Sequence, residues 1–445
     1  MTFDDFHLEP RVAAGVHACG YTIPTPVQVQ AIPPALQGLD VMGLAQTGTG
    51  KTAAYALPIL QRLLAGPKGV LRALVLAPTR ELTEQIRACF RELGSGTRLS
   101  TMTIYGGVGM GLQVDTLRRG VDIAVACPGR LLDHIGQRTI DLSHIEVLVL
   151  DEADMMLDMG FLPDVRRILT YLPARRQNLM YSATMPDPIR ALSAAILHEP
   201  VTVQIGHAAP VETVSHALFP VPQHLKTTLL LELLLKTDTE SVLIFTRTKH
   251  RAKKLGDQLM KQGYHAASLQ GNLSQNARQA ALAGFREGRY SILVATDIAA
   301  RGIDVSQISH VINYDIPDTT DAYTHRIGRT GRALRSGDAF TLVTSDDGPL
   351  VRDIERVLGS SIERRTLDGF DYTKPAPRRD TEFAWDPRPQ SRRTPSSADV
   401  TPSVGQRTGD QRRSQPVHHR ENSVNGRNRP AARPVRTVSG KSAGS

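Results

Sequence analysis

The sequence predicts an α/β protein: two successive domains, each built on a parallel β-sheet, and then a disordered basic tail. Short, wholly apolar runs alternate with helical stretches in two separate series, which is typical of parallel sheets covered on both faces. At 445 residues the chain is longer than one hydrophobic core usually serves. After about residue 370, proline, arginine, serine, glycine and asparagine replace the apolar residues that a core requires.

The expected strands fall into two groups. The first group comprises VMGLA (41–45), RALVLAP (72–78), TMTIYG (101–106), DIAVAC (122–127), EVLVLDE (146–152) and NLMYSAT (178–184). The second comprises SVLIFT (241–246), YHAASLQ (264–270), SILVATD (291–297), HVINYD (310–315) and DAFTLVT (338–344). GHAAPVET (206–213) lies between them and is interpreted as a linker. The predicted boundaries are 1–206 for the first domain, 207–214 for the linker, 215–370 for the second domain and 371–445 for the tail.

The charge of the chain is unevenly distributed. From Lys374 onward there are 15 Lys+Arg against 6 Asp+Glu, which accounts for the whole net charge of +9. The tail can therefore act as a diffuse polycation, whereas any nucleic-acid affinity of the remainder must come from locally placed groups. The N-terminus lacks signal-peptide character, no run is apolar enough to span a membrane, and the three cysteines are widely spaced. A cytoplasmic protein with reduced thiols and no membrane association is expected.

The stretch LAQTGTGKTAA (44–54) is the first that indicates a chemical role. It lies between an expected strand and an expected helix. There, glycines let backbone N–H groups face phosphates, Lys51 can reach the outer phosphates, and Thr52 can place a hydroxyl on Mg²⁺. Ala45 stands where the strict pattern has glycine, so the match is to a relaxed form. The alternative is a glycine-rich turn that happens to contain Gly-Lys-Thr.

Four carboxylates follow the fifth expected strand, in VLVLDEADMMLDMG (147–160). Asp151 can contribute to a Mg²⁺ shell and Glu152 can position an attacking water, as phosphoryl-transfer sites require. The alternative is that acidic residues favour the first turn of any helix. The upstream phosphate loop favours the chemical interpretation for Asp151 and Glu152. Asp158 is interpreted as a solvated or capping residue.

A series of motifs in order resembles the DEAD-box RNA helicase family over residues 3–365. The motifs are GYTIPTPVQ (20–28), AQTGTGKT (45–52), PTREL (78–82), GG (106–107), PGR (128–130), DEAD (151–154), SAT (182–184), LIF (243–245), QNAR (275–278), ATDIAARGID (295–304) and HRIGRTGR (325–332). The resemblance implies two RecA-like domains, RNA as partner, and ATP and Mg²⁺ as cofactors. It also implies ATP-dependent RNA binding and local duplex unwinding.

The resemblance further implies roles for individual residues. Those expected to bind the nucleotide are Phe3, Tyr21, Gln28, Thr47, Gly48, Thr49, Gly50, Lys51, Thr52, Gly302 and Asp304. Among these, Gln28 is expected to read the adenine edge. Lys51, Asp151, Glu152, Arg329 and Arg332 are the expected catalytic residues, with Thr52 and Asp151 at the metal. Asp154, Ser182, Thr184 and His325 are expected to couple ATP to RNA.

RNA is expected to contact Thr79, Arg80, Gly107, Gly129 and Arg130 in the first domain, and Thr246, Gly271, Arg278 and Thr296 in the second. Such groups suit phosphate contacts that do not read sequence. Cys127 departs from the family, which usually has threonine before PGR. A thiol is a weaker hydrogen-bond donor, so replacing Cys127 by threonine is expected to tighten RNA binding or leave it unchanged.

Two further functions are considered. An ATP-gated RNA clamp or annealing chaperone, driven largely by the basic tail, is the main alternative to a helicase. A DNA translocase is disfavoured by the adenine-reading motif and by the lack of a strand-separating insertion. Ribosomal or RNA-decay assemblies are candidate partners.

Overall fold

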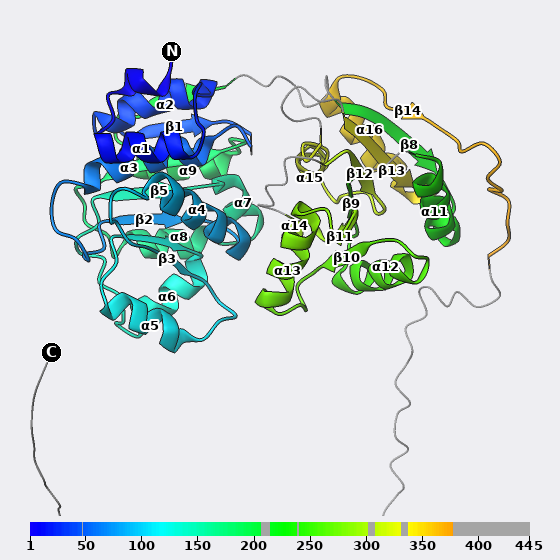
Figure 1. Ribbon diagram of the computed structural model, residues 1–445. Coiled ribbons are helices and arrows are strands. Elements are labelled where there is room, and N and C mark those ends of the chain that lie inside the picture. The colour runs from blue at the N-terminus through cyan, green and yellow to red at the C-terminus, as the bar shows by residue number, and fades with distance from the viewer. Residues whose placement is uncertain (47, 206–213, 238–239, 301–307, 331–336, 377–445) are drawn as a thin grey trace, which may run out of the picture. The chain divides into compact units, whose positions relative to one another are not determined.

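The computed structural model of the protein describes residues 1–46, 48–205, 214–237, 240–300, 308–330 and 337–376 (Figure 1). The expected tail from residue 377 onward lies outside these ranges, and so does the expected linker apart from its last residue. That residue, Val214, already belongs to a strand.

Two seven-stranded sheets, with every strand parallel to its neighbours, organise the described residues. The first contains β1 (Val41–Leu44), β2 (Ala73–Leu76), β3 (Thr101–Ile104), β4 (Ile123–Ala126), β5 (Val147–Leu150), β6 (Gln177–Ser182) and β7 (Val201–Gln204). The second contains β8 (Val214–Pro220), β9 (Val242–Phe245), β10 (Ala266–Leu269), β11 (Ile292–Ala295), β12 (His310–Asn313), β13 (Gly337–Val343) and β14 (Glu363–Arg364). The predicted fold class is confirmed.

The two sheets have the same winding. Their strand orders are β3-β4-β2-β5-β6-β1-β7 and β10-β11-β9-β12-β13-β8-β14, so every strand of the first sheet has a counterpart at the same position in the second. Three strands were not expected from the sequence, namely β7, β8 and β14. They lie together at one side of their sheets and are partly exposed, so they lack the continuous apolar runs of the central strands.

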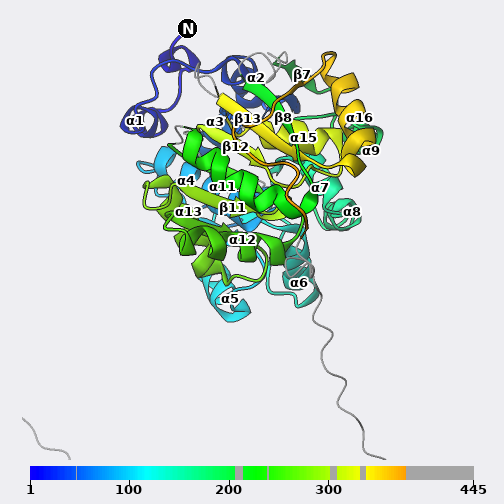
Figure 2. The same cartoon turned by 90° about the vertical axis from the view of Figure 1, so that its right-hand side faces the viewer.

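Helices cover both faces of each sheet (Figures 1 and 2). In the first half these are η1 (Phe3–Phe6), α1 (Pro10–Ala18), α2 (Pro26–Leu36), α3 (Lys51–Leu63), α4 (Arg80–Leu93), α5 (Met110–Arg118), α6 (Pro128–Gly136), α7 (Ala153–Asp158), α8 (Leu162–Leu169) and α9 (Asp187–Ile196). In the second half they are η2 (Gln223–Leu225), α11 (Lys226–Lys236), α12 (Lys249–Lys261), α13 (Gln275–Arg286), α14 (Asp297–Ala300), α15 (Thr320–Ile327), η3 (Ser345–Asp347) and α16 (Gly348–Leu358).

Alternation along the central strands divides the apolar core of each half into layers. In the first half, Val75 and Val149 face the layer beneath α1 to α4, whereas Leu74 and Leu148 face the layer beneath α6 to α9. In the second half, α11 and α12 cover one face, and α13, α15 and α16 cover the other. No described helix has the length and apolar character needed to cross a lipid bilayer.

Strand register brings three loops together at one edge of the first sheet. Leu44, at the end of β1, pairs with Ser182 at the end of β6, and Leu150, at the end of β5, pairs with Met180. The carboxyl ends of parallel strands meet at the same edge. The glycine-rich segment, the DEAD segment and the SAT segment are therefore neighbours, although they are far apart in the sequence.

The opposite end of α3 is fixed by Arg72, a buried arginine at the start of β2. Its guanidinium donates to the carbonyl oxygens of Leu63 at 3.0 Å and Ala65 at 2.6 Å, and it pairs with Glu146 at 2.6 Å. These carbonyl groups end the helix and have no partner within it. Arg72 therefore caps the helix that begins at the candidate site.

Replacing Arg72 by methionine should lower the free energy of unfolding by about 2–3 kcal/mol, because the end of α3 loses its buried donors while the aliphatic volume is kept. Urea denaturation measures the loss. Arg62 is a matched control, since its guanidinium lies 3.3 Å from the same Glu146 but is exposed. Arg62→Met should cost less than about 1 kcal/mol. Equal losses in the two variants would contradict the capping role.

Candidate functional site

The glycine-rich loop joins β1 to α3. Gly48 and Gly50 have φ of 87° and 93°, in the left-handed region that favours glycine. A Cβ on Gly50 would also lie 2.5 Å from Nε2 of Gln28. Helix α3 begins immediately afterwards, at Lys51, so the N–H groups of its first turn are available to a phosphate. Of the predicted loop residues, Thr47 lies outside the described residues.

Lys51 and Asp151 lie where β1 and β5 end. The Lys51 Nζ donates to the carbonyl oxygen of Ala45 at 2.8 Å, and both side chains are buried. The hydroxyl of Tyr55 donates to Oδ2 of Asp151 at 2.8 Å. Burial raises the pKa of Asp151 to about 6, with Lys51 opposing this shift and Glu152 adding to it. A cation bound at this carboxylate would favour its ionised form.

Tyr55 was not among the residues expected from the sequence. It lies four residues after Lys51 on α3, on the same face of the helix, and this spacing is the only sequence signal for it. Its ring is also 5.4 Å from that of Tyr181 on β6. The hydroxyl therefore holds the Asp151 carboxylate from the helix that starts at the phosphate loop.

Glu152 has a left-handed backbone, with φ 50° and ψ 55°, directly before α7. For a residue with a Cβ this conformation costs about 1–3 kcal/mol, and such strained residues cluster at functional sites. Its N–H donates to Oδ1 of Asp151 at 3.0 Å. The turn thus places two acidic residues of different backbone conformation side by side at the edge of the sheet.

Asp154 is bonded to the SAT segment. Its Oδ2 accepts hydrogen bonds from the N–H of Ala183 at 3.1 Å and of Thr184 at 2.9 Å, and from the Thr184 hydroxyl at 3.1 Å. The Asp154 N–H donates to the Ser182 hydroxyl at 3.2 Å. The predicted neighbours of Asp154 in the first half are thus in contact with it. Asp158, by contrast, is exposed, in agreement with its interpretation as a solvated residue.

The residues present fit Mg²⁺ as a partner of a bound nucleotide. Among the described residues, no group of three or more His, Cys, Asp or Glu side chains could hold a metal ion alone. Mg²⁺ is typically held by one or two carboxylates together with substrate phosphates, which matches one buried aspartate beside a phosphate loop. Asp151 and the Thr52 hydroxyl are the groups that would hold it.

The expected adenine-reading residues lie next to the loop. The Gln28 carboxamide accepts from the Thr25 N–H at 2.9 Å and donates to the Gly50 carbonyl oxygen at 3.1 Å. A carboxamide has two lone pairs and two N–H groups, so its hydrogen bonds to Thr25 and Gly50 use one of each, and the second of each suits the edge of a base. The rings of Phe3 and Tyr21 are 5.8 Å apart, with Phe3 buried and Tyr21 exposed. Tyr21 therefore offers a face on which a base can stack.

Two guanidinium groups converge on the glycine pair of the first half. A Cβ on Gly107, where φ is 85°, would lie 2.2 Å from Nη1 of Arg80. A Cβ on Gly106 would lie 3.7 Å from Arg80 Nη2 and 3.8 Å from Arg130 Nη2. Gly129 is exposed and has nothing within 4 Å of its Cβ position. This arrangement of cations and open backbone suits phosphate groups.

Cys127 is the N-cap residue of α6 and forms no side-chain cap hydrogen bond. The equivalent residues of α4, α12 and α15 are Thr79, Thr248 and Thr319, and each hydroxyl accepts from a backbone N–H of the first turn. Burial raises the pKa of Cys127 to about 12, so it is a neutral thiol. Helix α6 therefore lacks the cap that threonine would provide.

The second half places its predicted RNA residues at strand ends and helix starts. Thr246 and Thr296 follow β9 and β11, and Arg278 lies in the first turn of α13, which Ser274 caps. Thr246 is buried, Thr296 is half-buried and Gly271 is exposed. Both donors of Thr246 are engaged, since its N–H donates to the Ala295 carbonyl oxygen at 2.9 Å and its hydroxyl to the Thr248 carbonyl oxygen at 3.3 Å. A phosphate contact at Thr246 therefore requires one of these hydrogen bonds to be exchanged.

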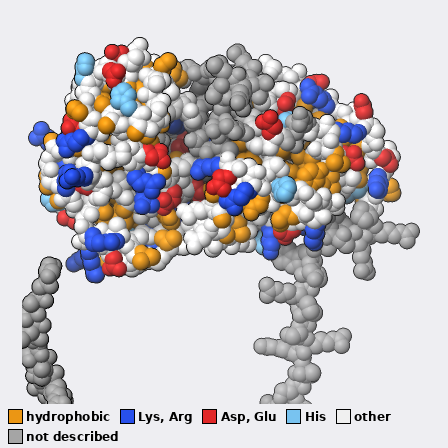
Figure 3. Space-filling model, in the orientation of Figure 1, with side chains coloured by type: hydrophobic (Ala, Val, Ile, Leu, Met, Phe, Trp, Pro, Cys, Tyr) orange, Lys and Arg blue, Asp and Glu red, His pale blue; other side chains and the backbone are white. Residues whose placement is uncertain are grey.

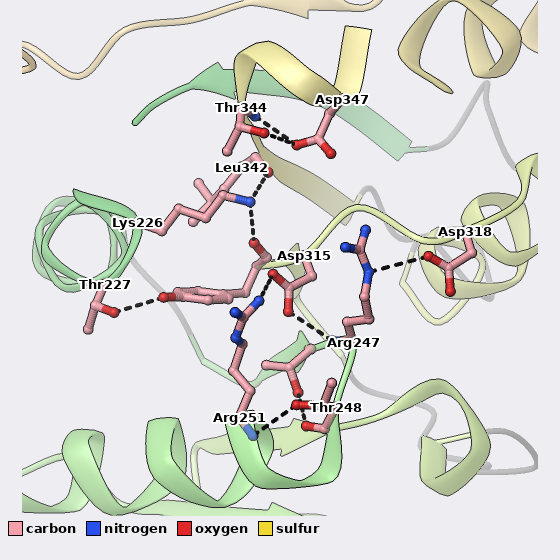
Figure 4. A network of polar contacts seen from close by, with 12 residues as sticks. Lys226, Thr227, Arg247, Thr248, Arg251, Asp315, Asp318, Leu342, Thr344 and Asp347 are labelled. Carbon is pink, nitrogen blue, oxygen red and sulfur yellow. Dashed lines mark hydrogen bonds and ion pairs between the residues drawn. The ribbon is translucent and has the colours of Figure 1, made fainter. Parts of the chain in front are cut away.

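A closed polar network takes the place of a phosphate loop in the second half (Figure 4). Lys226 is the first residue of α11, as Lys51 is of α3, and α11 follows the strand that corresponds to β1. Its Nζ donates to the carbonyl oxygens of Tyr314 at 3.1 Å and Leu342 at 3.0 Å. The segment VPQHL (221–225) before it contains no glycine. In the second half, the lysine at this position therefore binds backbone carbonyl groups at the ends of β12 and β13. The corresponding place in the first half is the candidate nucleotide site.

The arginines of HRIGRTGR have different environments. Arg326 is buried in a bidentate ion pair with Asp297, at 2.6 and 2.7 Å, and lies over the ring of Phe245. Arg329 follows the end of α15, and its Nε donates to the His325 carbonyl oxygen at 3.3 Å. Helix α15 ends at Ile327, directly before Gly328, and glycine is a poor helix former. The other predicted residues of this region, Arg332, Gly302 and Asp304, lie outside the described residues.

Two identically wound sheets, with a phosphate loop on the first, define a P-loop protein with tandem RecA-like domains. Residues 25–192 match the family described as DEAD/DEAH box helicase, and residues 225–334 match the helicase conserved C-terminal domain. With these matches and the relatives below, the chain belongs to the DEAD-box helicase family.

Two bacterial RNA helicases are similar to the chain over most of its length. The chain is 44% identical over 368 residues to the ATP-dependent RNA helicase DeaD of Mycobacterium tuberculosis, covering 82% of this chain and 65% of that protein. It is 40% identical over 373 residues to the DEAD-box ATP-dependent RNA helicase CshA of Bacillus subtilis, covering 83% of this chain and 75% of the relative. The chain thus spans about two thirds of the length of the Mycobacterium relative.

A solved structure of Saccharomyces cerevisiae Dbp5 bound to RNA and ADP BeF3 resembles the chain as well. The two are 30% identical with a TM-score of 0.73, and the match covers 82% of this chain and 95% of the Dbp5 chain in that structure.

Replacing Cys127 by threonine should raise the free energy of unfolding by about 0.5–2 kcal/mol, because the hydroxyl can accept a first-turn N–H of α6. RNA affinity should rise or stay unchanged, as measured by equilibrium binding of a labelled single strand. Thr248→Cys, which removes an existing cap from α12, is the matched control and should lower stability by a similar amount. Lower stability of the Cys127→Thr variant, or weaker RNA binding, would contradict the conclusion that α6 lacks a cap that threonine can supply.

Proposed function

We propose that the chain is an RNA-dependent ATPase that couples ATP binding and hydrolysis to RNA binding without sequence preference and to local separation of short duplexes. The observation that carries the proposal is the convergence of Lys51, Asp151 and Glu152 at the ends of β1 and β5, the two strands that flank β6, with Asp154 bonded to the SAT segment that ends β6. The names of the relatives and of the Dbp5 complex support the same activity.

The loop and α3 bind the phosphates of ATP. Lys51 exchanges the Ala45 carbonyl oxygen for a phosphate oxygen, while the first-turn N–H groups of α3 receive the remaining phosphate charge. Thr52 and Asp151 would hold Mg²⁺, which would neutralise part of that charge. Tyr55 keeps Asp151 oriented, and Glu152 positions the attacking water. Gln28 and Tyr21 select the adenine base.

The second half completes the reaction. Arg329 and Arg332 stabilise the charge that develops on the γ-phosphate, as arginine fingers do in phosphoryl transfer. Asp154, with Ser182 and Thr184, transmits the state of the nucleotide to the RNA-binding segments. Arg80, Arg130 and the exposed glycines contact phosphates of the strand, so the RNA is recognised by its backbone. A cytoplasmic location and ribosomal or RNA-decay partners stay predictions from the sequence.

Replacing Glu152 by glutamine should lower RNA-stimulated ATP hydrolysis by roughly 100-fold or more, because the amide cannot take a proton from water. ATP affinity should change little, since the phosphate loop is intact. The exposed Asp158 supplies the control: Asp158→Asn should retain the hydrolysis rate of the parent. Wild-type turnover by Glu152→Gln would overturn the proposed mechanism.

The distribution of charge favours a second candidate, an RNA clamp or annealing chaperone that depends on the tail. Basic and acidic side chains are intermingled on the face of the described residues drawn in Figure 3, whereas the segment from Lys374 onward carries the whole net charge. Leu367, Phe370 and Tyr372 pack against the core, and His224 Nε2 lies 2.8 Å from the Lys374 carbonyl oxygen. The packed chain thus continues past residue 370, the predicted boundary of the second domain.

Truncation after Ala376 separates the two candidates because it preserves the packed segment and the contact to His224. A helicase should keep ATP hydrolysis at saturating RNA within about twofold, with weaker RNA affinity and a smaller dependence on salt. A chaperone that depends on the tail should lose strand annealing, measured with two complementary labelled RNA strands. Truncation after Thr373 serves as a comparison, since it also removes Lys374.

A further inference from the structure

Helix α5 is attached to the first half in an unusual way. All of its residues are described, and only one of them, Gln113, is buried. Its neighbours α4 and α6 are instead anchored by leucine and other apolar side chains. An apolar side chain tolerates small shifts, whereas hydrogen bonds require a defined distance and angle. Leu117, which is half-buried, is a residue of α5 that packs against the apolar core, so the position of α5 depends on this contact and on the hydrogen bonds of Gln113.

These hydrogen bonds close the loop that contains Gly106 and Gly107. The Gln113 Nε2 donates to the carbonyl oxygen of Tyr105, which directly precedes the glycine pair, at 3.0 Å. From the other side, Arg130 Nη1 donates to the carbonyl oxygen of Val108 at 3.0 Å. The glycine loop is thus held at two points, one by α5 and one by α6.

His134 links α5 to α6. It is fully buried on α6, with Nε2 at 3.1 Å from Oε1 of Gln113 and Nδ1 at 2.7 Å from the Thr139 hydroxyl. Because the Gln113 amide nitrogen is committed to Tyr105, its oxygen must accept, so His134 carries its proton on Nε2. Burial, and then Arg130, lower the pKa of His134, which favours this neutral form.

The same network reaches α4. The hydroxyl of Tyr105 donates to Oε1 of Glu84 at 2.6 Å, and the hydroxyl of Thr103 donates to the same oxygen at 2.9 Å. Glu84 lies one turn after Arg80 on α4. A chain of hydrogen bonds, which passes through the backbone and the side chain of Tyr105, therefore joins α4, α5 and α6. The candidate RNA contacts Thr79–Arg80, Gly106–Gly107 and Gly129–Arg130 lie at or just before the starts of these helices.

We propose that Gln113 and His134 are positioning residues that set the spacing of these three contacts, and that RNA affinity depends on their mutual hydrogen bond. The inference rests on the proposed function, because it assigns the partner of the three contacts as an RNA backbone. Successive phosphates have a fixed separation, so guanidinium and N–H groups bind them together only when the helices that present them keep their relative positions. None of these side chains contacts the nucleotide loop, so ATP hydrolysis without RNA does not depend on them.

Gln113→Leu, His134→Leu and the double variant test this pair, with a labelled oligouridine strand as the probe. Each single variant should weaken RNA binding by about tenfold, which corresponds to about 1.4 kcal/mol. The RNA affinity of the double variant should be no lower than that of the single variant with the lower affinity, because both substitutions remove the same Gln113–His134 hydrogen bond. The KM for ATP and the hydrolysis rate without RNA should stay within about twofold of the parent. Thr139→Val, which removes one hydroxyl, gives a milder variant should the leucine variants fail to fold.

Ile145→Val is the control for a purely structural effect. Ile145 is buried just before β5, at the opposite edge of the sheet from the RNA contacts. Its variant should lower the thermal midpoint without altering RNA affinity. Unchanged RNA binding in folded Gln113→Leu, His134→Leu or Thr139→Val, or additive losses in the double variant, would overturn the inference. An equal loss of RNA affinity in Ile145→Val would do the same. Failure of the parent protein to bind RNA would instead refute the proposed function.

Discussion

Parallel pairing of the strands is the constraint on which the rest of the molecule depends. Because every strand runs in the same direction, all loops that follow a strand emerge at one edge of the sheet. In the first half this brings the glycine-rich loop, Asp151 and the SAT segment into contact, with Leu44 opposite Ser182 in the register. The helices that present Arg80 and Arg130 start at the same edge. Position in the sheet, and not proximity in the chain, thus assembles the candidate site.

The two halves have the same strand order but differ in what lies at the start of corresponding helices. Lys51 and Lys226 occupy corresponding helix starts, and each donates to a backbone carbonyl oxygen. In the first half the helix start is preceded by glycines with positive φ, which leave room for a phosphate. In the second, Lys226 is fastened to two strand ends and its pKa is lowered by burial. The local sequence before the lysine, and not the topology, decides which half has a loop that suits a phosphate.

The motif residues of the candidate site could be predicted from the sequence. The polar side chains that hold them in position could not. Lys51, Asp151 and Asp154 lie in segments whose composition and order already indicated phosphate chemistry. Tyr55 and His134 lie in helices where a tyrosine or histidine reads as an ordinary packing residue. Their roles depend on which atoms they meet across the fold: the hydroxyl of Tyr55 meets Asp151, and His134 meets Gln113. Such hydrogen bonds join residues of different helices and strands, so no local pattern in the sequence indicates them.

The sequence by itself determined the class of fold and the central strands, and it indicated which segments to expect at the candidate site, because apolar periodicity and glycine spacing are local properties. Tertiary structure decided β7, β8 and β14, which are partly exposed and lack the apolar runs of the central strands, and the partners of the buried polar groups. It also showed that Cys127 leaves α6 without a side-chain cap and that Arg326 is enclosed in an ion pair with Asp297. The physical reason is that a buried polar atom must find a partner wherever the fold provides one, and that partner is fixed by packing and not by the neighbouring residues.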